Sequence, residues 1–172
     1  MKKFLTLILV AVFTALLFIP TGAVLADQAY HTERLPVNSV ASEYPLRNGV
    51  VVNIHMNGPV IFGAEEWILN GAKPNTTYQL AREFQEPFLG IFPPETPLDS
   101  GFVLQTNSKG NGNSHVTILP AEVAPVIEYG QTTVHVRLVF IVGGSTNGNG
   151  VIVGGTKAYE TDWIEDYLDQ WK

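Results

Sequence analysis

Histidine is the residue type in this chain that is best suited to metal chemistry, and the sequence contains four of them. His55, His115 and His135 fall on predicted strands, at positions that face away from the apolar side chains. Three imidazoles on neighbouring strands would suit zinc or copper. The short spacing typical of a local metal motif, such as His-x-His, is missing. The three histidines are therefore weak metal candidates, and simple exposure to solvent is the alternative.

The sequence shows no residue set that is typical of catalysis. The chain has no cysteine, which excludes thiol catalysis and thiolate metal ligands. No serine lies in a Gly-x-Ser-x-Gly turn. Glu65 and Glu66 are adjacent on a predicted strand, so they point to opposite faces and do not form a catalytic pair. We therefore predict no catalytic residue, no cofactor and no enzymatic activity.

A proline-rich connection over residues 85–100 carries several apolar side chains. Among them, Phe88, Ile91 and Phe92 are candidates for contact with a partner. Apolar residues in a long loop either cover the end of the core or form an exposed contact patch. The sequence leaves both interpretations open.

Aromatic residues near the C-terminus form the second candidate surface. Trp163 and Trp171 share one face of a predicted helix with Tyr167. This face either packs on the domain or docks on a partner or a membrane surface. A glycan would need exposed aromatic rings, for which Trp67 is a further candidate, and a protein is the other class of partner.

The positions of these side chains depend on where the folded domain begins. Residues 1–26 have the three-part layout of a secretory signal, with Lys2 and Lys3, an apolar stretch over residues 4–19, and small residues before a cleavage site after Ala26. The apolar stretch is shorter than the roughly 20 residues that span a bilayer. We therefore predict a secreted or cell-envelope protein of prokaryotic type, with no membrane span after cleavage.

The charge of the chain also limits its partners. The formal net charge is −6, and removal of Lys2 and Lys3 with the signal makes it two units more negative. Such a protein repels phosphate, so nucleic acid is not an expected partner. The remaining chain is long enough for one domain that is stable through its core alone.

Strand patterns dominate that domain. We expect an irregular segment over residues 27–48, with one short strand around residues 35–40, and then strands over residues 49–160. The clearest alternation lies over residues 132–142, and glycine-rich turns join several strands. Residues 161–172 predict an amphipathic helix, capped by Thr161 or Asp162. Because no helix pattern lies between the strands, the sequence predicts an all-β protein, an antiparallel sandwich of two sheets.

Two segments carry a resemblance to known domains. The turn Pro74-Asn75-Thr76-Thr77-Tyr78 resembles the tyrosine corner of fibronectin type III and related immunoglobulin-like sandwiches. The loop over residues 104–112 is similar to one in exported prokaryotic β-sandwich domains, including chordin-like ones. The resemblance implies a sandwich, a buried Tyr78 whose hydroxyl bonds the backbone upstream, and a role as a binding or spacer module.

Together these observations predict an exported, non-catalytic β-sandwich that acts as a binding or structural module. The alternative is a metal-binding protein or metal-dependent enzyme that uses the strand histidines.

Overall fold

The computed structural model describes residues 31–55, 62–122, 124, 130 and 133–167, and most of this part of the chain is β-strand. Within it, no helix is long and apolar enough to cross a membrane. In chain order the strands are β1 (His31–Ser39), β2 (Asn48–His55), β3 (Gly63–Asn70), β4 (Thr77–Phe84), β5 (Leu98–Gln105), β6 (Gly112–Ile118), β7 (Thr133–Val142), β8 (Ser145–Thr146), β9 (Ile152–Val153), β10 (Thr156–Thr161) and β11 (Ile164–Tyr167).

One large antiparallel sheet contains most of these strands. Its order is β5-β4-β7-β10-β1-β2-β3-β6, and β11 pairs with β7 beside this path. Strands β8 and β9 form a separate two-stranded sheet. The predicted all-β, antiparallel class is therefore confirmed. The expected pair of separate sheets is replaced by a single sheet that continues from one half of the molecule into the other.

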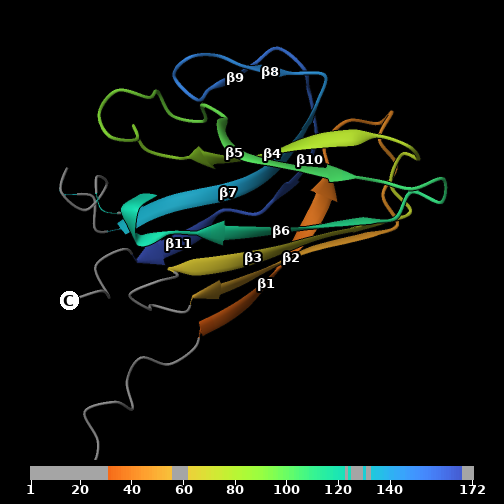
Figure 1. Ribbon diagram of the computed structural model, residues 1–172, viewed down its shortest axis with the longest axis horizontal. Helices are drawn as coiled ribbons and strands as arrows, with labels where there is room; N and C mark the ends of the chain where they lie inside the picture. Colours follow the sequence, from red (N-terminus) through yellow and green to blue (C-terminus); the bar gives the residue numbers. More distant parts are fainter. Residues whose placement is uncertain (1–30, 56–61, 123, 125–129, 131–132, 168–172) are drawn as a thin grey trace, which may run out of the picture.

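Strand β1 joins these two halves. Residues 31–36 pair with β2, whereas residues 37–39 pair with β10. Pro36 lies where the partner changes, and proline suits such a point because it has no N–H to donate to a ladder. At the other side of the sheet, β5 and β6 follow each other in the chain and come close together. The sheet is thereby rolled into a nearly closed barrel with two facing layers (Figure 1).

The core fills the space between the layers. Trp67 of β3 and Phe140 of β7 come from opposite layers, and their ring centroids lie 5.0 Å apart at an edge-to-face angle of 70°. Both residues are fully buried, as is Tyr78. Such edge-to-face contacts between aromatic rings add to the stabilisation that their burial provides. The two layers are therefore held together by one shared core.

The turn before β4 and the loop between β5 and β6 close one end of the barrel. The backbone N–H of Ala72 donates to the carbonyl oxygen of Gly110 at 2.9 Å. Gly110 has a φ of +75°, and a Cβ atom there would lie 2.0 Å from the carbonyl oxygen of Ala72. Only glycine fits this approach without displacing the backbone. Both segments that carry the resemblance thus meet at this closed end.

A pair of tyrosines lies beneath this closed end. Tyr78 is buried as expected, and its hydroxyl lies 3.3 Å from the hydroxyl of Tyr159. Burial raises the pKa of Tyr78, and the hydrogen bond with Tyr159 raises it further. The hydroxyl that reaches the upstream backbone belongs to Tyr159, which donates to the carbonyl of Pro45 and accepts the N–H of Lys73.

The predicted C-terminal helix is wrong over the described residues. Residues 156–161 form β10 and residues 164–167 form β11, so the chain stays extended. Strand β10 pairs with one end of β7, and β11 supplies a partner for the other end. The N–H and C=O groups at the edge of β7 need hydrogen-bond partners. This need favours extended backbone over helix in residues 156–167. Residues 168–172 lie outside the described residues.

Thr161 does not cap a helix either. Its side-chain oxygen accepts the backbone N–H of Leu138 at 3.0 Å, at the break between β10 and β11. In a continuous ladder, a backbone carbonyl oxygen would accept the N–H of Leu138. At this break the hydroxyl oxygen of Thr161 accepts it instead. Thr161 is 2% exposed, so this hydrogen bond is buried.

The N-terminal part of the domain is also more regular than predicted. Strand β1 occupies His31–Ser39, within the segment expected to be irregular, and it buries Leu35 and Val37. The folded domain therefore includes residues well before position 49. The inner face of β2 is the one that carries Val51 and Asn53, which are buried between the layers, while Val50 on the other face is only half-buried. Valine on both faces of β2 made its alternation ambiguous.

A candidate binding cavity at the open end of the barrel

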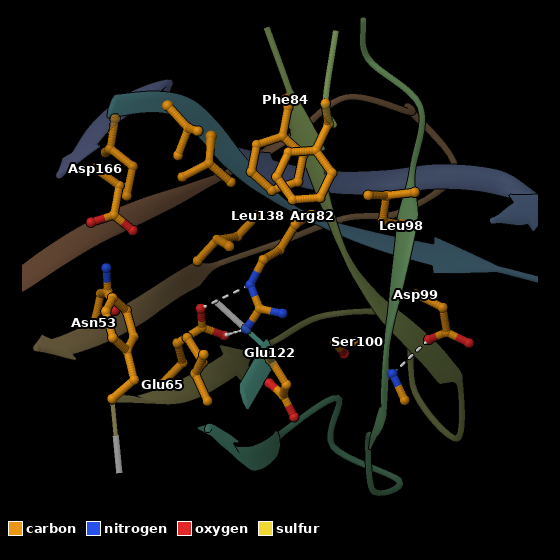
Figure 2. A pocket seen from close by; sticks show the side chains of 17 residues that line it. Asn53, Glu65, Arg82, Phe84, Leu98, Asp99, Ser100, Glu122, Leu138 and Asp166 are labelled. Carbon is orange, nitrogen blue, oxygen red and sulfur yellow. Dashed lines mark hydrogen bonds and ion pairs between the residues drawn. The ribbon is translucent and has the colours of Figure 1, made fainter. Parts of the chain in front are cut away.

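The end of the barrel opposite the tyrosine pair contains a cavity of about 470 Å³. Its walls come from both layers, and the close-up in Figure 2 shows their side chains converging on one space. A cavity of this size lies within the usual range for small-molecule sites. No pattern in the sequence predicts this cavity.

One wall of the cavity is aromatic. Phe84, at the end of β4, stacks on Phe88 with ring centroids 3.9 Å apart and an angle of 8° between the rings. Phe62 and Val134 are buried beside them, and Ile118 packs against the same cluster. These side chains form an apolar surface on which a ligand could replace water, and burial of that surface favours binding.

An ion pair between the layers forms a polar part of the cavity lining. Arg82 of β4 donates to both carboxylate oxygens of Glu65 on β3, from Nε at 3.2 Å and from Nη2 at 2.8 Å. The indole Nε1 of Trp67 donates to the same carboxylate at 2.9 Å. The side chain of Glu65 is 3% exposed, and that of Arg82 is 21% exposed. This bidentate geometry compensates the burial of the two charges.

Strand alternation places these groups. Trp67 and Leu69 face the core on β3, and Glu65, two residues before Trp67, shares their face. On β4, Leu80 and Arg82 likewise share the inward face. The expectation that Glu65 and Glu66 point to opposite faces is consistent with this arrangement. A charge on the apolar face of each of two strands was the signal that could have indicated a buried pair.

Among the described residues, the rest of the ionisable lining is acidic. Asp99, Glu122 and Asp166 line the cavity together with the ion pair. The third nitrogen of the Arg82 guanidinium points away from Glu65 (Figure 2). The carboxylate of Asp99 accepts the backbone N–H of Gly101 at 2.9 Å and the hydroxyl of Thr146.

The loop after β4 contains three of the predicted partner residues. Phe88 packs in the aromatic wall, Phe92 is half-buried beside it, and Ile91 is 72% exposed. The N–H of Phe88 donates to the carbonyl of Phe92, and this closes a tight turn. Leu89 in that turn has a φ of +52°, which is uncommon for a residue with a side chain. The loop therefore both covers the core and exposes one apolar tip.

The structure does not bring His115 and His135 together. His115 of β6 lies with its Nδ1 2.6 Å from Glu66, on the outer face of one layer. His135 of β7 lies with its Nδ1 2.5 Å from Glu86, on the outer face of the other layer. The side chain of His55 lies outside the described residues. No three metal-binding side chains gather anywhere in the described part of the chain.

The contact between His135 and Glu86 changes the pKa of the Glu86 carboxyl group. Partial burial raises the pKa of Glu86, but hydrogen bonds from the ring and the backbone N–H of His135 outweigh it. The pKa of Glu86 is therefore lower than its usual value.

The two described tryptophans, Trp67 and Trp163, do not form a common platform. Trp67 is fully buried, which excludes it as an exposed platform for a glycan. Trp163 lies under the guanidinium of Arg137, whose Cζ is 4.5 Å from the centre of its ring. Arg137 itself donates to the buried carboxylate of Glu83 at 2.7 Å. Trp171 lies outside the described residues.

No family model, no curated protein and no solved structure matches this chain. The candidate site therefore rests on the geometry described above.

Proposed function

We propose that this chain is a non-catalytic binding protein that holds a small, mostly apolar ligand in the cavity at the open end of the barrel. The observation that carries the proposal is the cavity itself, about 470 Å³ with an aromatic wall and a few polar groups. Apolar surroundings with few, well-placed polar groups are typical of small-molecule sites. The mouths of β-barrels are a common place for them.

The state of Glu65 supports binding rather than catalysis. Its carboxylate accepts hydrogen bonds from Trp67 and Arg82, and it is almost completely buried. A general base needs access to a substrate proton, whereas Glu65 is engaged by protein donors on both oxygens. Its role in the proposal is to hold Arg82 in place at the cavity wall.

The proposal retains two expectations from the sequence. The first is export, with residues 1–26 as a cleaved signal; these residues lie outside the described part of the chain. N-terminal sequencing of the protein recovered from outside the cytoplasm should begin at Asp27. The second is the resemblance of residues 74–78 and 104–112 to segments of immunoglobulin-like sandwiches, which stays a prediction from the sequence.

Titration with N-phenylnaphthylamine, a neutral apolar probe that fluoresces on leaving water, tests the binding proposal. We expect saturable binding to the purified protein, and loss of binding in Ile118→Trp, which places a large ring at the cavity wall. The matched control is Val153→Trp, an exposed position on β9 away from the cavity, which should bind as the wild type does. The absence of saturable binding to the folded wild-type protein would refute the proposal.

A further inference from the structure

We infer that Arg82 selects the ligand of the cavity by donating a hydrogen bond to a neutral acceptor oxygen, such as the carbonyl group of a ketone on an alkyl chain. This inference rests on the proposed function and names the chemical class of its ligand. It follows from the geometry of the pair that Arg82 forms with Glu65.

The pair leaves one nitrogen of the Arg82 guanidinium unused. Nε and Nη2 both donate to the carboxylate of Glu65, at 3.2 and 2.8 Å. The third nitrogen, Nη1, points away from Glu65 in Figure 2, and it has no acceptor among the described residues. Two of the five N–H donors of a guanidinium are on this nitrogen. Nη1 can therefore bind a ligand while the ion pair stays intact.

The pair is accessible from the cavity on the side of Arg82. Both residues line the cavity, and the side chain of Arg82 is 21% exposed whereas that of Glu65 is 3% exposed. The neighbours of Arg82 on the inward face of β4, Leu80 and Phe84, are apolar. A hydrocarbon that displaces water here leaves Nη1 without a partner, whereas an acceptor oxygen replaces that water. The site therefore favours an apolar ligand with one acceptor group.

The hydroxyl of Ser100, another donor in the lining, is already engaged. It donates to the backbone carbonyl of Leu80 at 2.6 Å, and its oxygen accepts the N–H of Phe102 at 3.3 Å. A ligand oxygen would have to break the first of these bonds to reach the Ser100 proton. Nη1 of Arg82 donates to a ligand without such a loss.

The charge balance of the pair favours a neutral acceptor over a carboxylate. The carboxylate of Glu65 lies 2.8 Å from the guanidinium and compensates its charge. A ligand carboxylate would lose its hydration on entering the cavity, and the balanced pair would not repay that loss. A ketone carbonyl loses far less hydration, and one hydrogen bond from Nη1 replaces it.

Two ligands of the same shape test the inference. Methyl hexyl ketone and its methylene analogue differ only in the group that replaces the carbonyl oxygen, and both are assayed by displacement of N-phenylnaphthylamine from the purified protein. Arg82→Lys keeps a positive charge opposite Glu65 but lacks the third nitrogen of the guanidinium. In this variant we expect the ratio of ketone affinity to analogue affinity to fall about fivefold, which corresponds to the loss of one hydrogen bond.

The matched control is Arg34→Lys, at an exposed position on β1, where this ratio should stay as in the wild type. An unchanged ratio in Arg82→Lys would overturn the inference, because any change in affinity would then come from the shape of the cavity alone.

A measurement on the wild-type protein does not depend on the folding of a variant. The resonance of an isotope-labelled carbonyl carbon moves downfield when its oxygen accepts a hydrogen bond. At saturation, we expect the carbonyl resonance of bound methyl hexyl ketone to lie downfield of its position in cyclohexane. A resonance at the cyclohexane position would show that the bound carbonyl has no donor, and this would overturn the inference.

Octanoate separates the inference from the proposed function. We expect octanoate to displace the probe only at a concentration at least about tenfold higher than the ketone, because its charge loses more hydration. If octanoate competes as well as the ketone, the inference is overturned while the binding function stands. If the probe and all three ligands fail to bind to the folded protein, the binding function fails and the inference fails with it.

Discussion

At the scale of single residues, the pair formed by Glu65 and Arg82 connects stability to the cavity. The two residues come from facing layers, so the pair links β3 to β4 across the interior. Removing one charge from a buried pair leaves the other charge uncompensated, and this is more destabilising than replacing both. The cavity lining therefore depends on both residues being present.

Arg82→Met tests this dependence. We expect the free energy of unfolding to fall by about 3 kcal/mol, at the low end for buried pairs because Arg82 is partly exposed. Urea denaturation followed by far-ultraviolet circular dichroism gives this value. The double variant Glu65→Gln/Arg82→Met should recover part of the loss, and the exposed Arg34→Met should change stability by less than about 0.5 kcal/mol. A loss no larger than that of Arg34→Met would contradict the argument.

The contact of His135 with Glu86 makes a prediction about pH. Because the pKa of folded Glu86 is lowered, the contribution of this carboxylate to stability is present above the pKa of the unfolded chain. It is lost as the pH falls through the folded pKa. The contribution is small, because both side chains are more than a third exposed and solvent screens the pair.

A pH titration of the Glu86 carboxyl carbon by nuclear magnetic resonance should find this lowered pKa. In His135→Ala the ring donor is lost, so the pKa should move up toward its usual value. In His115→Ala, which changes the equivalent contact on the other layer, the pKa of Glu86 should stay as in the wild type. An unchanged pKa of Glu86 in His135→Ala would be evidence against the hydrogen bond as the cause.

At the scale of elements, the end of the chain shows how a sheet edge overrides a local pattern. Trp163, Tyr167 and Trp171 recur every four residues, which suits one face of a helix. Four is also a multiple of two, so the same residues share one face of a strand. The edge of β7 resolves this ambiguity, because β11 supplies the hydrogen bonds that β10 leaves unmade.

Thr161→Val tests the junction between β10 and β11. Valine has nearly the same shape as threonine but does not accept the N–H of Leu138, so a buried donor is left without a partner. We expect a loss of about 1–3 kcal/mol in the free energy of unfolding. Thr156→Val at the exposed start of β10 is the matched control, and it should have little effect. Amide hydrogen exchange of Leu138 should become faster in the first variant alone.

The strands that sequence analysis predicted best have one consistently apolar face. On β7, Val136 and Leu138 are buried while Arg137 lies on the outer face, as the alternation indicates. The cavity could not be predicted in this way. It depends on the register between layers and on the roll of the sheet, which bring Glu65 to Arg82 from separate parts of the chain. Neither property is encoded in the alternation of one strand.

At the scale of the whole molecule, the two layers are linked through β1, which pairs first with β2 and then with β10. Its Leu35 and Val37 are buried in the shared core. Each such side chain contributes about 1.5–3 kcal/mol through burial, and the ladder hydrogen bonds add to this. The total stability of a domain is only about 5–15 kcal/mol. The loss of β1 should therefore remove most of the stability of the barrel.

Two shortened chains test this conclusion. A chain that begins at His31 keeps all of β1, and we expect it to unfold in one cooperative urea transition, with fluorescence and circular dichroism changing together. A chain that begins at Ala41 lacks β1, and it should show no cooperative transition because the layers lose their shared strand. Trp67 reports on this directly, since it is buried between the layers and should be exposed to water in the shorter chain. A cooperative transition of the shorter chain at a similar urea concentration would show that the layers hold together without β1.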